Sequence, residues 1–395
     1  PQICKSGNKK SSLLFFFVYL ISKFSGANSN FNLAAFISLE KQITEKIYHS
    51  EKTLECCDPE YLLVFEDGIG GPLELISAAK KRSIFVAVCP YEISQRKDLE
   101  NLISRNRRKK TEYLPPTNLI GKYFEWSSAK WIFHDRLGQS LLLPAELILA
   151  RKCTGIEPTN PWAINGGQAD LIATESTKCH AIYLDNGIPA NKLTIAGSAY
   201  SDKLFQLKDR NPNRVRSKTL VLISLPPNFD NDFDNNCCGS YFKMLQMLKS
   251  QIERHPNLDA LISIHPATLD RDRKDILSFD WKISNKPILE DLHQSQICIS
   301  VFSSTIRWFL ASSVPVINLD VWNFGLELYN KSTGFLNCKD EASFTKNLSE
   351  LASQKNLVQL RKEMSKVAGE WGTIDGKATS RLLETLRSRN EKLKR

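Results

Sequence analysis

The chain alternates short apolar runs with segments whose apolar residues recur at helical spacing. In the first half, the run YLLVF at 61–65 predicts a strand, residues 72–82 predict a helix with proline at its start, and IFVAVC at 84–89 predicts a second strand. This order is typical of a β-α-β unit with parallel strands. Weaker strands are predicted at 130–134, 169–174 and 192–196, and Gly187 is the expected C-cap of the helix between the last two.

The second half repeats the alternation after a polar, basic and proline-bearing stretch at 206–218, which we interpret as a domain linker. Strands are predicted at 219–225, 260–264, 297–301 and 314–319, and helices at 241–254 and 305–312. We therefore expect an α/β protein of two doubly wound Rossmann-like domains facing a central cleft. The expected boundaries are 1–210 for the N-terminal domain, 211–376 for the C-terminal domain and 377–395 for a basic C-terminal helix.

Composition agrees with this organisation and limits the chemistry. A length of 395 residues suits two domains, and 42% hydrophobic and 24% charged residues are ordinary for a folded soluble protein. The net charge of +10 suits an anionic ligand, nucleic acid or an acidic membrane face. The ten cysteines show neither a C-x-x-C pair nor zinc spacing, so we expect no disulfide framework and no metal site, and a cytoplasmic location.

The most apolar run near the start is LLFFFVYLI at 13–21, which follows Lys9 and Lys10. That order is similar to a secretory signal. Nine residues are too few to span a bilayer. A buried parallel strand produces the same continuous apolar run, and this is the structure we expect.

Three polar groups come directly after predicted strands. Doubly wound folds bind their ligands at the carboxyl ends of the strands, so these groups are the candidate site residues. They are Glu66-Asp67-Gly68 after YLLVF, His265-Pro266 after LISI, and Ser303-Ser304-Thr305 after CISVF.

The serine group and the histidine both suit an anion. Serine or threonine at a helix start satisfies free backbone N–H groups, and the same N–H groups and the helix dipole favour a phosphate. The group is therefore a phosphate site or only a helix cap. His265 can donate to a phosphate or ribose oxygen, with Pro266 fixing the backbone after the strand, although a lone histidine is more often structural.

The acidic pair has a catalytic and a structural interpretation. Adjacent carboxylates at a strand end point in roughly opposite directions, so one of Glu66 and Asp67 can face a cleft while the other bonds the following loop. A partly desolvated carboxylate has a raised pKa and can take a proton from an attacking hydroxyl. The same three residues are also common in solvated turns.

The order of these motifs resembles the GT-B glycosyltransferases of bacterial surface polysaccharide synthesis. EDG, then ESTKCHAIYLDNGIPANKLTIAGSAYSDKL, then ISIHP, then ISVFSSTIRWFLASSVPVINLD is similar in pattern to the sialyltransferase and polysialyltransferase group, over about residues 60–336. That group carries a D/E-D/E-G motif, an HP motif and a paired Ser/Thr motif. The nucleotide-sugar 2-epimerases and the glycerophosphate polymerases of teichoic acid synthesis share parts of the second half.

The resemblance implies an inverting transfer from a CMP- or UDP-linked sugar to a glycan or lipid-linked acceptor. The first domain would hold the acceptor and the second the nucleotide sugar. Glu66 or Asp67 would be the general base, with Asp67 preferred, and His265 with Ser303 and Ser304 would bind the donor phosphate, helped by a basic residue such as Arg307. The resemblance implies no cofactor and no metal.

Other interpretations stay open. A nucleotide-sugar 2-epimerase would use the same donor site without an acceptor, although its DSGG-type loop is replaced by FSST here. A binding or inactive relative is a third reading, and we expect no nucleic-acid partner because no recognised motif appears. Asp320 and Glu327 are candidates for ribose contacts or a solvated loop. The basic run at 104–110 and the basic tail suit a solvated surface or a peripheral contact with the inner face of the cell membrane.

Overall fold

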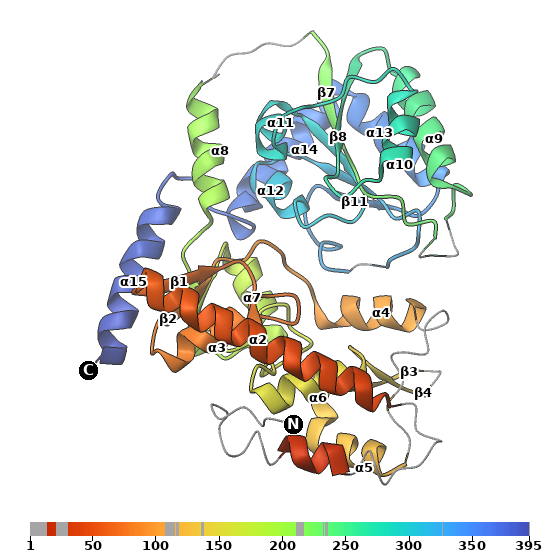
Figure 1. Ribbon diagram of the computed structural model, residues 1–395. Coiled ribbons are helices and arrows are strands. Elements are labelled where there is room, and N and C mark those ends of the chain that lie inside the picture. The colour runs from red at the N-terminus through yellow and green to blue at the C-terminus, as the bar shows by residue number, and fades with distance from the viewer. Residues whose placement is uncertain are drawn as a thin grey trace. The chain divides into compact units, whose positions relative to one another are not determined.

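The computed structural model contains two compact units (Figure 1). One comprises Pro1–Ala173 with Ile182–Thr194, and the other comprises Thr174–Ala181 with Ile195–Arg395. The structure describes residues 14–20, 31–106, 115, 118–135, 138–210, 217–231, 233, 236–325 and 327–394. Residues 107–110 of the basic run at 104–110 and residues 211–216 of the predicted linker at 206–218 lie outside these ranges.

The first unit is built on a parallel sheet with strand order β1-β2-β5-β6. Every residue of β2 and β5 is buried, which explains why their sequences are continuous apolar runs rather than alternating ones. The strands are β1 (Tyr61–Val64), β2 (Phe85–Val88), β5 (Leu171–Thr174) and β6 (Leu193–Ile195). The helical elements of this part of the chain are α2 (Leu33–Cys57), α3 (Leu73–Lys81), α4 (Arg96–Asn106), α5 (Asn118–Ser128), η3 (Ala129–Trp131), α6 (Ala145–Thr154), α7 (Thr177–Asp185) and η4 (Ala190–Lys192). The predicted β-α-β unit is confirmed as β1-α3-β2.

Two predicted strands near this sheet are wrong or differently paired. Residues 14–20 form a helix, not a strand, and Val18 is buried in an apolar cluster that also contains residues of α2 and α5. Phe15 of this helix stacks on Phe36 of α2 with ring centroids 5.5 Å apart. A helix that is apolar on all sides is compatible with the same run of letters, so the pattern could not exclude it. The strand predicted at 130–134 belongs to an antiparallel hairpin of β3 (Ile132–Asp135) and β4 (Gly138–Leu141) instead.

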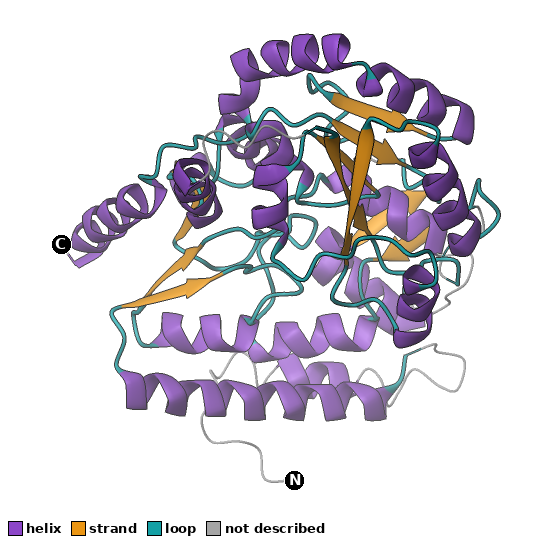
Figure 2. Ribbon diagram, turned by 90° about the horizontal axis from the view of Figure 1, so that it is seen from above, coloured by secondary structure: helices purple, strands orange, loops and turns teal. Residues whose placement is uncertain are grey.

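The second unit is a five-stranded parallel sheet with strand order β11-β10-β9-β7-β8. Figure 2 shows its strands between helices. The strands are β7 (Thr219–Leu225), β8 (Leu258–Ile264), β9 (Ile297–Ser300), β10 (Val316–Leu319) and β11 (Phe335–Cys338). The helical elements are α8 (Ala199–Arg210), α9 (Tyr241–Glu253), α10 (Asp270–Leu277), α11 (Ile288–Gln294), α12 (Ile306–Ala311), α13 (Glu341–Ala352), α14 (Gln354–Val367), η5 (Ala368–Glu370) and α15 (Ala378–Lys394).

The strand order of the second sheet reverses once. From β7 the chain adds β8 on one side and then β9, β10 and β11 on the other, which is the flavodoxin-like order with its switch point between β7 and β9. The described strands of the first sheet, in contrast, follow one another in a single direction. The predicted α/β class with parallel sheets is confirmed.

The two compact units do not divide at residue 210, which is the predicted domain boundary. The segments 174–181 and 195–210 belong to the second unit. The Asp202 carboxylate in α8 accepts hydrogen bonds from the backbone N–H groups of Ala378 (2.9 Å) and Thr379 (2.8 Å), which fixes the start of α15 on α8. The functional domains 1–210, 211–376 and 377–395 stay a prediction, while the helix expected in the basic tail is α15. None of the helices within the described ranges has the length and hydropathy needed to cross a membrane.

Candidate functional site

Glu66 lies in the turn after β1, and its side chain is half-buried. Its Oε1 accepts a hydrogen bond of 2.9 Å from the backbone N–H of Gly70. Burial raises the pKa of Glu66 above the ordinary value for glutamate, and the nearby charges of Glu92 and Asp67 act in the same direction, against the Gly70 hydrogen bond. Glu66 is thus a partly accessible carboxylate with a proton affinity higher than usual, as a general base requires.

Asp67 is held inside the first unit, with only 1% of its surface exposed. Its Oδ2 accepts a hydrogen bond of 2.8 Å from the backbone N–H of Ala169, and its own N–H donates to Asn165 Oδ1 at 3.2 Å. Burial raises the pKa of Asp67, against hydrogen bonds from the Ala169 and Gly167 backbones. The two adjacent carboxylates therefore lie in different environments. Glu66 is half-buried, whereas Asp67 is buried and connects its own loop to the loop at 165–169.

Glycine is required where these two loops meet. A Cβ on Gly68 would lie 1.9 Å from the backbone oxygen of Ile164, and a Cβ on Gly167 would lie 1.8 Å from the backbone oxygen of Asp67. No side chain fits between backbones this close. The glycine-rich sequence after the acidic pair thus permits a direct backbone contact that immobilises the pair.

His265 follows β8 directly, as predicted, and is exposed. Its N–H donates to Leu225 O at 3.2 Å, and its Nδ1 accepts a hydrogen bond of 3.1 Å from the N–H of Ala267, in the turn that Pro266 begins. With Nδ1 as acceptor, the neutral ring carries its proton on Nε2. The local turn thus sets the tautomer and makes Nε2 a hydrogen-bond donor.

Ser303, Ser304 and Thr305 form a tight turn between β9 and α12. Ser303 Oγ accepts a hydrogen bond of 3.2 Å from the N–H of Thr305 and lies 2.7 Å from Thr305 Oγ1. Ser303 and Ser304 are half-buried, and Thr305 is buried. The turn begins at Phe302, whose φ of 47° places it in the left-handed region. Ser303 therefore stabilises the turn before α12, whereas the N-cap residue Thr305 makes no side-chain capping bond to the helix. Phosphate binding stays a prediction.

The sheet brings the histidine and serine groups to one edge. All of its neighbouring strands are parallel, so the loops after β8 and β9 leave from the same carboxyl edge on the two sides of β7. Adjacent strands lie about 4.8 Å apart, so these loops start roughly 10 Å from each other. The acidic pair lies in the other unit.

Two other candidate side chains, Arg307 and Asp320, are hydrogen-bonded to other groups of the protein. Arg307 is 1% exposed and donates to the carboxylate of Glu175 and to the backbone oxygen of Ser304. Asp320 is 3% exposed and accepts hydrogen bonds from the N–H groups of Phe324 (2.5 Å) and Gly325 (3.0 Å). Both side chains stabilise loops at the carboxyl edge. Exposed Glu327 lies in the segment after β10 that also contains Asp320.

Two polar residues that bond to the serine turn or to α12 were not predicted. Glu175 comes directly after the strand β5, so the rule that selected the other groups could also have selected it. Asn318 lies within β10, and its Oδ1 accepts a 3.0 Å hydrogen bond from the N–H of Phe302. No sequence pattern marks a strand asparagine as a loop anchor.

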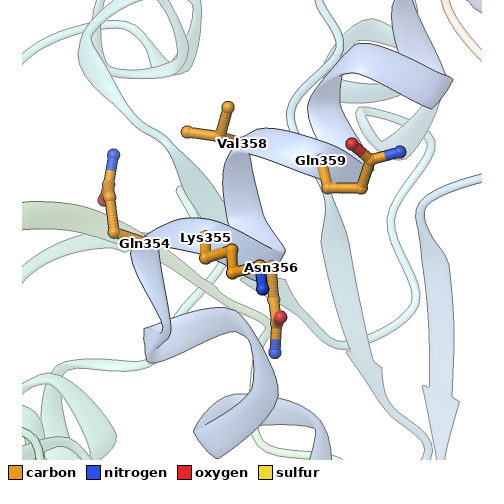
Figure 3. Close-up of a pocket in the computed structure, with 5 residues that line it drawn as sticks. All are labelled: Gln354, Lys355, Asn356, Val358 and Gln359. Carbon is orange, nitrogen blue, oxygen red and sulfur yellow. The ribbon is translucent and has the colours of Figure 1, made fainter.

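A shallow concave surface lies away from these residues, at the start of α14. Figure 3 shows the side chains that line it pointing in different directions from one helix end, and none of the candidate residues is among them. They are Gln354, Lys355, Asn356, Val358 and Gln359. We attach no chemistry to this surface.

Comparison with known proteins gives the fold. No family model and no curated protein matches the chain. A crystal structure of a putative UDP-N-acetylglucosamine 2-epimerase from Listeria monocytogenes is similar, with TM-score 0.52 and 14% identity over 90% of this chain and 81% of that one. The structure of UDP-GlcNAc 2-epimerase from Neisseria meningitidis, bound to UDP-GlcNAc, has a TM-score of 0.50 and 15% identity, and the match covers 89% of this chain and 82% of that one. The S. aureus MnaA–UDP structure has a TM-score of 0.51 and 13% identity, and the match covers 88% of this chain and 78% of that one. The chain therefore has the GT-B-like α/β fold that its sequence predicted.

Proposed function

We propose that the chain is a nucleotide-sugar enzyme, an inverting glycosyltransferase whose donor nucleotide binds at the carboxyl edge of β7, β8 and β9. The observation that carries the proposal is the switch point between β7 and β9. Open α/β sheets bind ligands at such a point. Here the Ser303–Thr305 turn follows β9, which borders this point, and His265 follows β8 on the other side of β7.

The donor phosphate would be held by neutral donors at this edge. His265 Nε2–H is directed by its turn, and the hydroxyls of Ser303 and Ser304 are half-buried beside the start of α12. Hydrogen bonds to an anion are shorter and stronger than those to neutral groups. These groups would stabilise the negative charge that develops on the phosphate as the nucleotide leaves.

We propose Glu66 as the general base, because Asp67 is almost completely buried and bonded to backbone. In the transfer step, the acceptor hydroxyl oxygen forms a bond to the anomeric carbon while the bond from that carbon to the phosphate oxygen breaks. The hydroxyl proton passes to the Glu66 carboxylate, and the nucleotide leaves with the electron pair. Attack from the side opposite the leaving group inverts the anomeric carbon.

The partners follow from the same proposal. The donor is a CMP- or UDP-linked sugar, and the acceptor is a glycan or lipid-linked glycan of surface polysaccharide synthesis. The sialyltransferase-like motif order supports this choice, and the net charge of +10 suits an acidic glycan or a peripheral contact with the membrane.

A nucleotide-sugar 2-epimerase is the second candidate. It is favoured by one observation, which is that the similar structures include two described as 2-epimerases of UDP-N-acetylglucosamine. Identities of 14 and 15% carry the fold and not the reaction. The two candidates share a donor site and differ in whether an acceptor is needed.

Nucleotide release from candidate donors separates these functions. We expect the purified protein to release CMP or UDP from a matching nucleotide sugar only when a glycan acceptor is present, because attack on the anomeric carbon needs the acceptor hydroxyl. Release is measured by a coupled nucleotide assay, and the sugar product by mass spectrometry and NMR. Isomerisation of the sugar without any acceptor would establish the epimerase instead. If the protein neither turns over nor binds CMP-, UDP- or CDP-linked sugars, both the glycosyltransferase and the epimerase proposals are wrong.

His265→Ala is expected to weaken nucleotide binding by about 10- to 100-fold, the loss of one hydrogen bond to a charged group. The dissociation constant for CMP or UDP is measured by titration calorimetry. His255→Ala is the matched control, because His255 also precedes a proline but lies at the end of α9, 3.3 Å from Ser349 Oγ. Equal affinities in the two variants would exclude His265 from the donor site.

A further inference from the structure

Glu175 and Arg307 form a buried ion pair within the second unit. Glu175 is 5% exposed and Arg307 1% exposed, although 132 positions separate them in the chain. Arg307 Nε donates to Glu175 Oε2, and Trp308 Nε1 donates to Glu175 Oε1 at 3.2 Å. Both carboxylate oxygens are therefore engaged, and the orientation of the carboxylate is fixed.

The other side of Arg307 faces the serine turn. Its Nη1 donates to the backbone oxygen of Ser304, and its guanidinium carbon lies 4.9 Å from the ring centroid of Trp308. Burial lowers the pKa of Arg307, but the charge and hydrogen bond of the Glu175 carboxylate, together with the nearby Tyr329 hydroxyl, hold the pKa above its ordinary value. Arg307 therefore stays charged, and its bond to Ser304 is a charge-assisted one.

The turn needs this support because its first residue is strained. Phe302 has a φ of 47°, which is costly for a residue with a bulky side chain. Its N–H donates to Asn318 Oδ1 at 3.0 Å, and Asn318 Nδ2 donates to Asn337 Oδ1 at 2.8 Å on the neighbouring strand. The buried Asn318 side chain thus holds the backbone before the serines, and Arg307 holds it at the second serine.

We infer that the Glu175–Arg307 pair is a positioning device for the turn at 302–305, which keeps Ser303 and Ser304 in the conformation that receives an anion. Neither residue touches the ligand. The effect on the turn stands on its own, whereas the effect on nucleotide binding rests on the proposed function. An ion pair that only stabilised the fold would also be buried. The order of the turn and the stability of the protein therefore have to be measured separately.

The double substitution Glu175→Gln with Arg307→Met makes this separation. Removing one charge alone leaves the other buried and unpaired, which is strongly destabilising, whereas replacing both is often neutral. We expect the unfolding temperature of the double variant to lie within a few degrees of that of the parent protein. We expect the amide protons of Thr305 and Ile306, which bond to Ser303, to exchange about tenfold faster or more. Affinity for CMP or UDP is expected to fall about tenfold.

Arg361→Met is the matched control, since Arg361 Nε donates to Ser313 O, beyond the other end of α12. It should leave exchange at Thr305 and Ile306 unchanged. If the double variant does not fold, Arg307→Lys replaces it, because lysine keeps the charge but lacks the planar fork that reaches two partners. A folded variant with unchanged exchange at the turn overturns the inference. If the parent protein binds neither nucleotide, the proposed function fails and the exchange measurement still decides on the turn.

Discussion

Glu66→Gln lowers acceptor-dependent nucleotide release by about 100- to 10,000-fold, the usual contribution of a general base. Glutamine keeps an oxygen for the N–H of Gly70, so the turn after β1 is preserved while the proton acceptor is lost. The rate constant kcat is measured at saturating donor, together with the dissociation constant for the nucleotide. We expect kcat to fall and nucleotide affinity to stay within about twofold, because the nucleotide does not contact Glu66 in the proposed site.

The pH profile of the parent enzyme gives a second readout of the same residue. The base acts when deprotonated, so kcat/KM should rise with pH through the pKa of Glu66 and be lost below it. Burial raises that pKa, so the acid limb should lie above the ordinary range of a glutamate. Glu60→Gln, at the amino end of the same strand, is the control and should leave the profile unchanged.

Asp67→Asn decides between the two carboxylates. If Asp67 only ties the loops together, the asparagine oxygen can still accept from the Ala169 N–H, and activity should follow the amount of folded protein. Loss of turnover in a fully folded Asp67→Asn protein, with activity retained in Glu66→Gln, would return the base to Asp67. Circular dichroism and thermal unfolding report the folded fraction in both variants.

Gly68→Ala is expected to destabilise the first unit by about 3 kcal/mol or more, the upper part of the range for overpacking. The added methyl carbon would lie 1.9 Å from the backbone oxygen of Ile164, and two backbones cannot separate without breaking the loop contact. Urea unfolding followed by circular dichroism measures the change in the free energy of unfolding. Catalysis should be lost with it, since the same contact immobilises the acidic pair.

Gly369→Ala controls for the methyl group itself. A Cβ there meets nothing within 4 Å, and Gly369 lies in the helical turn η5 of the second unit. We expect a change of less than about 0.5 kcal/mol, the usual range for a surface substitution. A Gly68→Ala protein that is as stable as the Gly369→Ala protein would contradict the direct backbone contact between the two loops.

The sequence located most elements of both sheets, because their strands are buried and therefore continuously apolar. The run TLVLISL became β7 with the predicted bounds, and the polar groups at His265 and Ser303 do follow β8 and β9. The same reasoning failed at residues 14–20, where an apolar run packs as a helix on α2. A short run without polar interruptions carries no period, so only its neighbours could decide between helix and strand.

The roles of individual side chains at the site show the same division. Arg307 was expected to meet a phosphate, yet it binds Glu175 and the Ser304 carbonyl, because residue 175 and residue 307 meet only in three dimensions. Asp67 and Glu66 are adjacent and chemically alike, and burial alone distinguishes them.

The sequence by itself determined the α/β class and located most strands of the two parallel sheets and the polar residues that follow them, since local patterning encodes secondary structure. The tertiary structure decided the strand order with its switch point between β7 and β9, the burial of Asp67 and the ion pair behind the serine turn. Each of these depends on contacts between residues far apart in the chain, and such contacts leave no periodic trace in a single sequence.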